Sequence, residues 1–367
     1  MNKLLVLLII LAGIQACRNS PKSASSITTP TDSTNTSPIS VFPPLEAGTF
    51  EVSDKDFGEI IELHGESLPI DTIFAPSETQ MLIKDGYFIA STRKSDKFFY
   101  IFRLSDMKVV AHLGTHGRGP MEFTYPYLIR SQTPDKLCYI YDIAKEQLFY
   151  IDQQFNLKSS VPLPKSGEKN LGADKQIEII SDKEMIFTSA APKGKAIYSY
   201  HMDSTAFHEI YNLAFDKRFK LSYAYTGDFA VNYEKKRMVY AYKYFKALKF
   251  ISLDSLQERL IKFDYKEPEG KTAADILAPT SVTHYWGISA GKDRVYVLYS
   301  GRTPLVVSRE LDKGQGYIFV EEYDWNGNLK RKFRLDQWGY FHVDDNTNTI
   351  YMTADQEQPF YTFRLPG

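Results

Sequence analysis

The stretch GYFIAST (86–92) decides the fold, together with KFFYIFRL (97–104), which follows it after a short polar turn. Runs of this length, rich in aromatic and β-branched residues and bounded by turn residues, predict β-strands. Neither run alternates between apolar and polar positions. A sheet with one face in water would alternate, so these strands are predicted to be covered on both faces.

The same pair of runs recurs along the chain. The first run of each pair is preceded by a polar turn, and the six first runs begin 50, 48, 53, 57 and 54 residues apart: GYFIAST (86–92), KLCYIYD (136–142), EMIFTSA (184–190), RMVYAYK (237–243), RVYVLYS (294–300) and NTIYMTA (348–354). A second aromatic run follows each of them. In most units a tight turn and a more polar strand complete the set. Each unit is therefore predicted to be a four-stranded antiparallel meander.

Stacking such sheets around an axis covers both faces of every sheet without crossover helices. We therefore predict an all-β fold, a six-bladed β-propeller of four-stranded antiparallel blades. KTAADIL (271–277) is the only short run that favours a helix. The sixth unit ends three strands in, at FYTFRLPG (360–367), so the last blade should be closed by an N-terminal strand. We expect EIIEL (59–63) to pair beside YTFRL (361–365) and to remove an exposed edge.

The N-terminus resembles an export signal. Lys3 precedes an apolar run that is too short to span a bilayer, and Ala16-Cys17 follows. We interpret 1–16 as a lipoprotein signal peptide and Cys17 as the lipidated residue; an ordinary secretory signal is the alternative. Residues 17–50 form a Ser/Thr/Pro-rich tether, and 51–367 the propeller. Because Cys17 is expected to be lipidated, Cys138 has no cysteine left to form a disulfide with. It is expected to be a small buried hydrophobic residue.

The charge is balanced, with 44 basic and 45 acidic residues. Such a balance predicts no nucleic-acid partner and no attraction to a membrane surface beyond the N-terminal lipid. The basic, aromatic tract 235–250 is interpreted as a sheet edge or a glycan-facing surface. We expect a monomer whose partner is an envelope protein or a glycan.

The stretch GTHGRGPMEF (114–123) lacks the Lys-Ser or Lys-Thr pair of a phosphate loop, and no helix pattern follows it. It lies between the last strand of the first unit and the first strand of the second. One interpretation is purely architectural, a sharp crossing made by glycines. The other is functional, with His116, Arg118 and Glu122 reaching toward the mouth of the channel. Gly117 or Gly119 should have a positive φ in either case.

The long connections fall on one face of the predicted propeller: 114–125, 163–175, 213–226, 265–282 and the insertion 301–316. Elaborated loops commonly carry function, so this face is the predicted working surface. Arg302 opens the longest insertion and is a second candidate for ligand contact. Trp286 and Trp338, in YWGIS and QWGYF, are predicted either to stack on sugar rings or to pack between blades.

The lipoprotein start, the tether, the six units and the G-x-x-G-x-G-P-x-E-F crossing together resemble the TolB-like or NHL-like six-bladed propeller lipoproteins of Bacteroidetes. The resemblance covers roughly residues 50–367 and implies fold and location more than activity. The residues after Cys17 are RNSPKSASS. They lack the acidic cluster that directs lipoproteins to the cell surface in the bacteria that contain these similar proteins. The periplasmic face of the outer membrane is therefore favoured over the cell surface.

No catalytic residue, cofactor or metal is assigned from the sequence. The oxygen ligands that a hard cation would need are scattered, at Glu122, Asp228, Asn232 and Asp344. The sequence therefore favours a membrane-tethered propeller that binds a ligand or a protein in the cell envelope. The alternative is an enzyme at the channel mouth, a lactonase, hydrolase or lyase acting on a sugar derivative.

Overall fold

The computed structural model describes residues 42–70, 80–93, 95–162, 176–203, 206–265, 272–354 and 359–367. The chain divides into two units, Met1–Val41 and Phe42–Gly367, and the described residues belong to the second. Within the second unit Leu45 is already buried. The signal peptide, Cys17 and the loop 163–175 lie outside the described residues and stay predictions.

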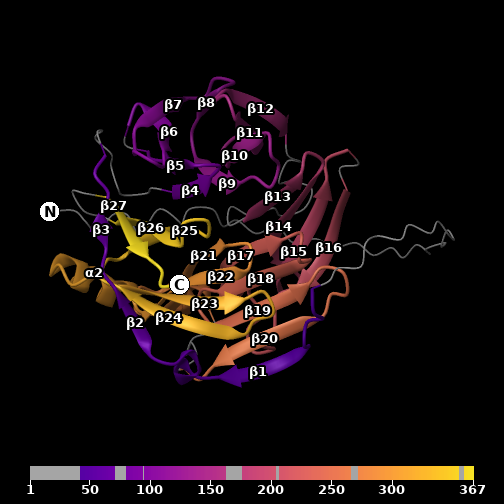
Figure 1. Ribbon diagram of the computed structural model, residues 1–367. Coiled ribbons are helices and arrows are strands. Elements are labelled where there is room, and N and C mark those ends of the chain that lie inside the picture. Colours follow the sequence, from indigo (N-terminus) through magenta and orange to yellow (C-terminus); the bar gives the residue numbers. More distant parts are fainter. Residues whose placement is uncertain are drawn as a thin grey trace, which may run out of the picture. The chain divides into compact units, whose positions relative to one another are not determined.

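Six sheets form the six blades (Figure 1). Blade 1 contains β4 (Gln80–Lys84), β5 (Tyr87–Ser91), β6 (Lys97–Arg103), β7 (Val109–His116) and β8 (Glu122–Phe123). Blade 2 contains β9 (Pro126–Arg130), β10 (Lys136–Asp142), β11 (Gln147–Asp152) and β12 (Leu157–Pro162). Blade 3 contains β13 (Ile177–Ser181), β14 (Glu184–Ala191), β15 (Gly194–His201) and β16 (Ala206–Asn212). Blade 4 contains β17 (Gly227–Asn232), β18 (Arg237–Tyr242), β19 (Ala247–Ser252) and β20 (Glu258–Phe263). Blade 5 contains β21 (Thr283–Ala290), β22 (Arg294–Arg302), β23 (Ile318–Asp324) and β24 (Leu329–Leu335). Blade 6 contains β25 (Gly339–Asp344), β26 (Thr349–Ala354) and β27 (Phe360–Arg364). The predicted six-bladed all-β propeller is confirmed, with all six middle strands at the expected places.

The hydrophobic core consists of six separate clusters, one between each pair of neighbouring blades. β22 shows why the middle strands are apolar throughout. Val295 and Val297 belong to the cluster between blades 4 and 5, whereas Tyr296 and Leu298 belong to the cluster between blades 5 and 6. Successive side chains of a strand point to opposite faces, and both faces are covered here, so apolar residues are favoured at successive positions.

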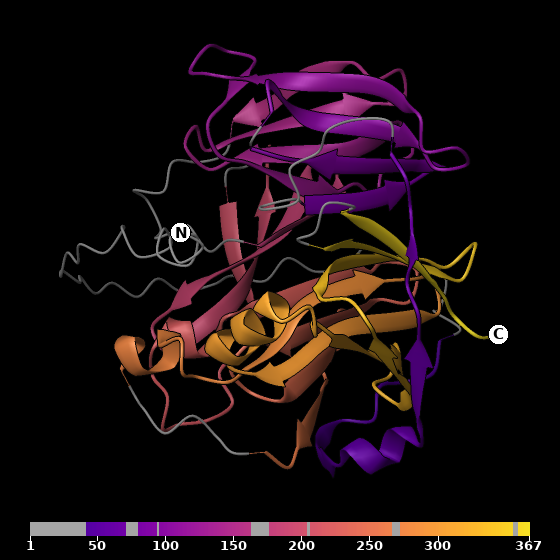
Figure 2. The ribbon, with the colours of Figure 1, turned by 90° about the vertical axis from the view of Figure 1, so that its left-hand side faces the viewer.

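The N-terminal segment runs along the outer edges of three blades, as the indigo strands of Figures 1 and 2 show. β1 (Gly48–Val52) pairs in parallel with β20 of blade 4, and β2 (Ile60–Leu63) pairs in parallel with β24 of blade 5. β3 (Glu66–Ser67) pairs antiparallel with β27 and closes blade 6. An N-terminal strand thus closes the last blade as predicted. The expectation that 59–63 is this strand is wrong, because these residues cover the preceding blade instead.

The half-exposed Asp54 and a group of buried charges hold this segment against the blades. Asp54, in the short helix η2 (Asp54–Phe57), accepts hydrogen bonds from Lys246 of blade 4 at 2.6 Å and Lys332 of blade 5 at 2.8 Å. Lys332 also binds Glu321, which is fully buried, at 2.9 Å. Burial opposes ionisation of Asp54, but the two lysines hold its pKa below the usual value. One carboxylate therefore joins the N-terminal segment to two blades.

Apart from η2 in the N-terminal segment, the helices of the described residues lie in the long connections. α1 (Ala273–Leu277) confirms the predicted helical run, and η3 (Ser222–Tyr225) is a single turn. α2 (Pro304–Asp312) lies within the 301–316 insertion and was not predicted. Its start has an ordinary signal, because the Thr303 side chain accepts a hydrogen bond from the Val306 N–H at 3.2 Å and Pro304 occupies the first turn.

The two ends of the propeller are named here by their connections. All six inner strands, β4, β9, β13, β17, β21 and β25, begin at one end, where the connections between blades and between second and third strands lie. We call this end the long-loop face. The inner strands finish at the opposite end, in the short turns to the second strands, and we call that end the turn face.

Candidate functional site

The crossing loop 114–123 is organised by Glu122. Its carboxylate accepts a hydrogen bond from the Gly119 N–H at 2.7 Å, and its own N–H donates to the Gly119 carbonyl at 3.1 Å. Gly117 has a φ of +151°, and a Cβ at that position would overlap the Glu122 carboxylate. The predicted positive φ is therefore confirmed at Gly117. Lys145 of blade 2 donates to the Glu122 carbonyl at 2.6 Å and fixes the loop from the next blade.

The other two candidates in this loop differ in their surroundings. A ring nitrogen of His116 lies 3.0 Å from the Ser95 carbonyl, and the imidazole packs 3.8 Å from the Phe98 ring. His116 thus joins the crossing loop to the connection between β5 and β6. Arg118 is exposed, and no described residue forms a hydrogen bond or an ion pair with it. Its guanidinium is available on the long-loop face.

Trp286 and Trp338 meet each other across blades 5 and 6. Their rings are edge to face, 5.6 Å apart, and both pack against the cluster between these blades. Each indole N–H is buried without a hydrogen-bond partner among the described residues. The Lys243 ammonium lies 4.6 Å from the Trp286 ring centroid. The two tryptophans therefore form part of the packing between blades, next to a cation.

Arg302 is held within its own insertion. Its side chain is 10% exposed and forms an ion pair with Glu310 of α2. The guanidinium also donates to the Tyr317 carbonyl and lies 3.8 Å from the centre of the Tyr317 ring. Arg302 is thereby placed where it fixes α2 to β22 rather than projecting from the surface.

Exposed large apolar side chains gather on the long-loop face. Of ten such side chains among the described residues, only Ile60 and Leu256 lie elsewhere; the other eight are Met121, Tyr125, Tyr127, Leu221, Leu277, Leu305, Val306 and Tyr340. They come from the connections that lead into blades 2, 4 and 5, from α2, and from the first residues of β9 and β25. Exposed large apolar side chains that collect on one face of a domain are candidates for a binding surface.

Tyr125 and Tyr127, two of these exposed residues, both lie beside the guanidinium of Arg93. The Arg93 guanidinium lies 5.1 Å from the Tyr125 ring centroid and 5.6 Å from that of Tyr127. The two tyrosines are 46% and 37% exposed. Sequence reasoning missed this group, although FTYPYLI (123–129) does contain an unusual signal: aromatic residues that continue beyond the crossing motif to the beginning of an inner strand.

A polar contact joins the beginnings of the inner strands of blades 3 and 4 near this face. Asp228 of β17 accepts a hydrogen bond from Gln176, next to β13, and this contact joins blades 4 and 3. Burial raises the pKa of Asp228 and lowers that of Lys243, which acts on Asp228 as a nearby positive charge. Deeper along β13, burial raises the pKa of Glu178 to about 7, and one of its carboxyl oxygens has no hydrogen-bond partner.

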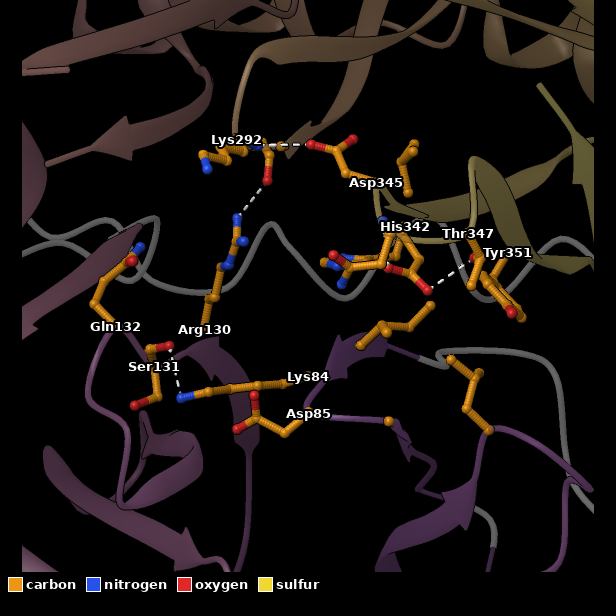
Figure 3. A pocket seen from close by; sticks show the side chains of 18 of the residues that line it. Lys84, Asp85, Arg130, Ser131, Gln132, Lys292, His342, Asp345, Thr347 and Tyr351 are labelled. Atoms are coloured by element: carbon orange, nitrogen blue, oxygen red, sulfur yellow. Dashed lines mark hydrogen bonds between the residues drawn. The ribbon is translucent and has the colours of Figure 1, made fainter. Parts of the chain in front are cut away.

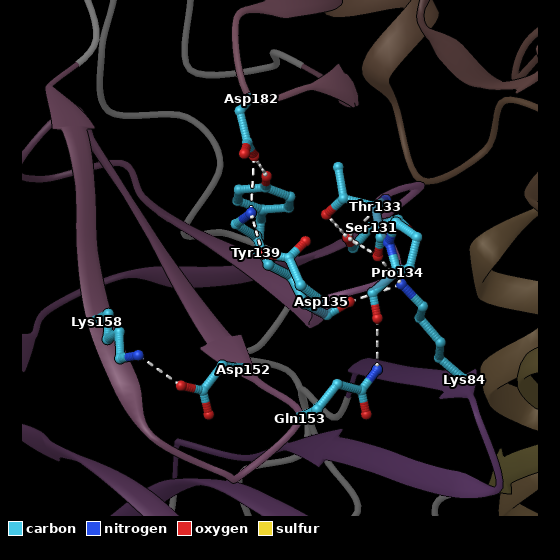
Figure 4. A network of polar contacts seen from close by, with 11 residues as sticks. Lys84, Ser131, Thr133, Pro134, Asp135, Tyr139, Asp152, Gln153, Lys158 and Asp182 are labelled. Atoms are coloured by element: carbon cyan, nitrogen blue, oxygen red, sulfur yellow. Dashed lines mark hydrogen bonds and ion pairs between the residues drawn. The ribbon is translucent and has the colours of Figure 1, made fainter.

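A second network lies at the turn face, between blades 1, 2 and 3 (Figure 4). The Lys84 ammonium donates to three carbonyls of the blade 2 turn, those of Ser131 at 3.1 Å, Thr133 at 2.6 Å and Lys136 at 2.6 Å. The Lys136 ammonium in turn binds Asp182 of blade 3 at 2.8 Å. These contacts fix the turn that follows β9, beside a cavity.

Within the described residues, no three His, Cys, Asp or Glu side chains are placed to hold a metal ion together. Nor does any helix in this part of the chain have the length and apolarity needed to cross a membrane.

Six radially stacked antiparallel blades closed by an N-terminal strand define the class: a six-bladed β-propeller. The chain belongs to the TolB-like family of six-bladed propellers, whose family model matches residues 56–346. No functionally curated protein matches it.

Two solved structures from Bacteroides share the fold. One is a member of the DUF4221 family from Bacteroides vulgatus, 13% identical, with a TM-score of 0.55 over 82% of this chain and 95% of that one. The other is from Bacteroides fragilis and is provisionally named an exported protein. It is 11% identical, with a TM-score of 0.57 over 87% of this chain and 99% of that one. At such identities the similarity shows the fold alone.

Proposed function

We propose that the protein is an envelope-attached binding module that captures a protein partner with its long-loop face. The observation that carries the proposal is the gathering of eight exposed large apolar side chains on this face. Interfaces are enriched in tyrosine, methionine and arginine, and Tyr125, Tyr127, Met121 and Arg118 supply these types together.

A protein partner fits this surface better than a glycan does. A sugar ring stacks on aromatic faces, and Tyr125 and Tyr127 could serve that purpose. Leu221, Leu277 and the α2 residues Leu305 and Val306 are aliphatic, and such side chains contribute mainly when a partner removes them from water. The mixture of aliphatic and aromatic side chains is typical of a surface that buries apolar area against protein.

Attachment to the envelope is supported by two independent features. The apolar run before Ala16-Cys17 is typical of a lipoprotein signal. A structural relative from Bacteroides fragilis is provisionally named an exported protein. We place the chain on the periplasmic face of the outer membrane, held through Cys17 and the tether that follows it.

The test uses paired surface variants. Tyr125→Ser with Tyr127→Ser, and separately Arg118→Ala, should lose crosslinked partners recovered from envelope fractions while their melting temperatures stay within a few degrees of wild type. Ile60→Ser is the matched control, because Ile60 is 48% exposed but lies on the outer edge of blade 5. Identical recovery by all variants would refute the proposed face. Retained binding of envelope polysaccharide, lost only in the tyrosine variant, would identify a glycan partner instead.

An enzyme at the channel is the second candidate, and Glu178 is the observation that favours it. A carboxyl group with a pKa of about 7 is suited to transfer protons near neutral pH. Turnover of sugar lactones or glycosides that is abolished by Glu178→Gln, and kept by the exposed control Glu209→Gln, would favour this candidate.

A further inference from the structure

The turn face contains a cavity of about 810 Å³ at the end of the channel (Figure 3). It is lined by the turns that follow the inner strands of blades 1, 2, 5 and 6, by Leu104 and Ser105 in the turn after β6, and by Tyr351 of β26. Its charged lining consists of three cations and three acids: Lys84, Arg130, Lys292, Asp85, Asp344 and Asp345. Neither the tryptophans nor the crossing loop contributes to it, so this cavity is separate from the surface proposed above.

Arg130, the last residue of β9, lies across this cavity. Its guanidinium donates one hydrogen bond, at 2.6 Å, to the carbonyl of Ala290 in β21. Blades 2 and 5 are opposite each other in a six-bladed ring, so the side chain reaches across the axis. No described residue forms an ion pair with Arg130. A guanidinium is always charged, and a partly buried charge normally has a partner of opposite sign.

The acids near Arg130 act on its charge only through space, without a direct ion pair. The Lys84 ammonium is occupied by three backbone carbonyls. The Asp345 carboxylate accepts the Lys292 N–H at 2.6 Å and does not contact the guanidinium. Glu178 also acts on Arg130 only at a distance, and burial raises the pKa of both acids.

His342 supplies an unpartnered polar group in the same cavity. It is 7% exposed, and no described residue forms a hydrogen bond with its ring. Burial, with Arg130 nearby, lowers the pKa of His342 to about 3, so the imidazole is neutral at physiological pH. A neutral imidazole has one donor and one acceptor, which suits a hydroxyl group better than a second negative charge.

We propose that this cavity binds a small hydroxylated monocarboxylate, such as a sugar acid. The free edge of the Arg130 guanidinium holds the carboxylate with two parallel hydrogen bonds. His342 binds a hydroxyl, and Asp344 and Ser131 at the cavity wall accept from others. The balance of three cations and three acids favours a single negative charge over a phosphate dianion. The inference does not depend on the proposed protein partner at the other face.

The experiment measures binding to the full-length protein by calorimetry, with glucuronate as the probe. Glucose is the uncharged match, glucose 6-phosphate the dianion, and acetate the minimal carboxylate. We expect glucuronate to bind more tightly than all three. Arg130→Gln should weaken glucuronate roughly ten- to a hundredfold, the range for a charge-assisted pair, and Arg130→Lys should recover only part of the loss. Arg309→Gln, which changes an exposed arginine of α2 on the long-loop face, should bind as wild type does.

Three results would overturn the proposal. The first is glucuronate binding no tighter than glucose, the second is tighter binding of glucose 6-phosphate, and the third is equal glucuronate affinity in Arg130→Gln. If Arg130→Gln does not fold, His342→Phe tests the same cavity: it removes the polar ring and should weaken glucuronate severalfold but leave acetate unchanged. Crosslinking of envelope partners by Arg130→Gln should match wild type, so failure here is distinguishable from failure of the proposed function.

Discussion

Glu178 should make the stability of the propeller depend on pH. Its ordinary pKa is 4.5, and burial raises the pKa in the folded state to about 7. Below pH 4.5 the carboxyl group is protonated in both states and adds no pH-dependent penalty. Between pH 4.5 and 7 the unfolded chain releases the proton and the folded chain keeps it, so stability falls. Above pH 7 the penalty is complete, at about 3 kcal/mol by linkage.

Glu178→Gln isolates this contribution. Glutamine has the same shape and no charge, so the free energy of unfolding of the variant, relative to wild type, should rise by about 3 kcal/mol between pH 4.5 and 8. Urea denaturation at several pH values measures it. Glu209→Gln, an exposed position on β16 of the same blade, is the control. Parallel pH curves for wild type and Glu178→Gln would refute the reasoning, because a carboxyl group that ionises freely in the folded state adds no such difference.

Three further predictions concern the architecture and the anchor. Gly117→Val should cost roughly 1–3 kcal/mol in urea denaturation, since it combines a strained φ with displacement of Glu122, whereas Gly119→Ala should cost less; equal losses would contradict this account. Deleting residues 1–67 should lower the melting temperature and promote aggregation, because the outer edges of blades 4, 5 and 6 become exposed, and deletion of residues 1–41 is the control that leaves them covered. Cys17→Ser should move the protein from membranes to the soluble fraction, and unchanged fractionation with unchanged lipid labelling would rule out the lipid anchor.

The sequence predicts the blades well because each middle strand lies between two apolar clusters. A side chain on either face of such a strand is buried, as Tyr296 is on one face of β22. The strand therefore appears in the sequence as an unbroken apolar run, and the runs can be counted. The N-terminal segment is harder to place. IIEL (60–63) pairs through its backbone with β24, and backbone hydrogen bonds carry little sequence information. An unpaired edge exists on every blade, so the sequence predicts that the segment covers an edge but not which one.

The candidate site is predicted less well, for a different physical reason. His116, Glu122 and Arg302 have the residue types of a binding site, yet their polar atoms are used to fix loops. Whether a polar side chain is free depends on partners distant in sequence. Ser95 is 21 residues from His116, for example. Arg118 has no such partner among the described residues, so its proposed contact with a ligand stays a prediction.

The same argument explains why Arg130 could not be found from the sequence. LIRSQTPDK (128–136) reads as the end of a strand and a polar turn, and arginine is ordinary there. Arg130 is distinguished by its position at the end of an inner strand, next to the axis of the propeller. Its hydrogen-bond partner, Ala290 of β21, lies across the axis and is 160 residues away in the sequence. In a propeller the axis is reached by one strand from every blade, so chemistry at the channel is assembled from residues roughly fifty positions apart. A motif search within a single blade cannot detect it, whereas comparing equivalent positions across the blades can: Lys84, Arg130, Ala290 and Asp344 all end their inner strands and all line the cavity.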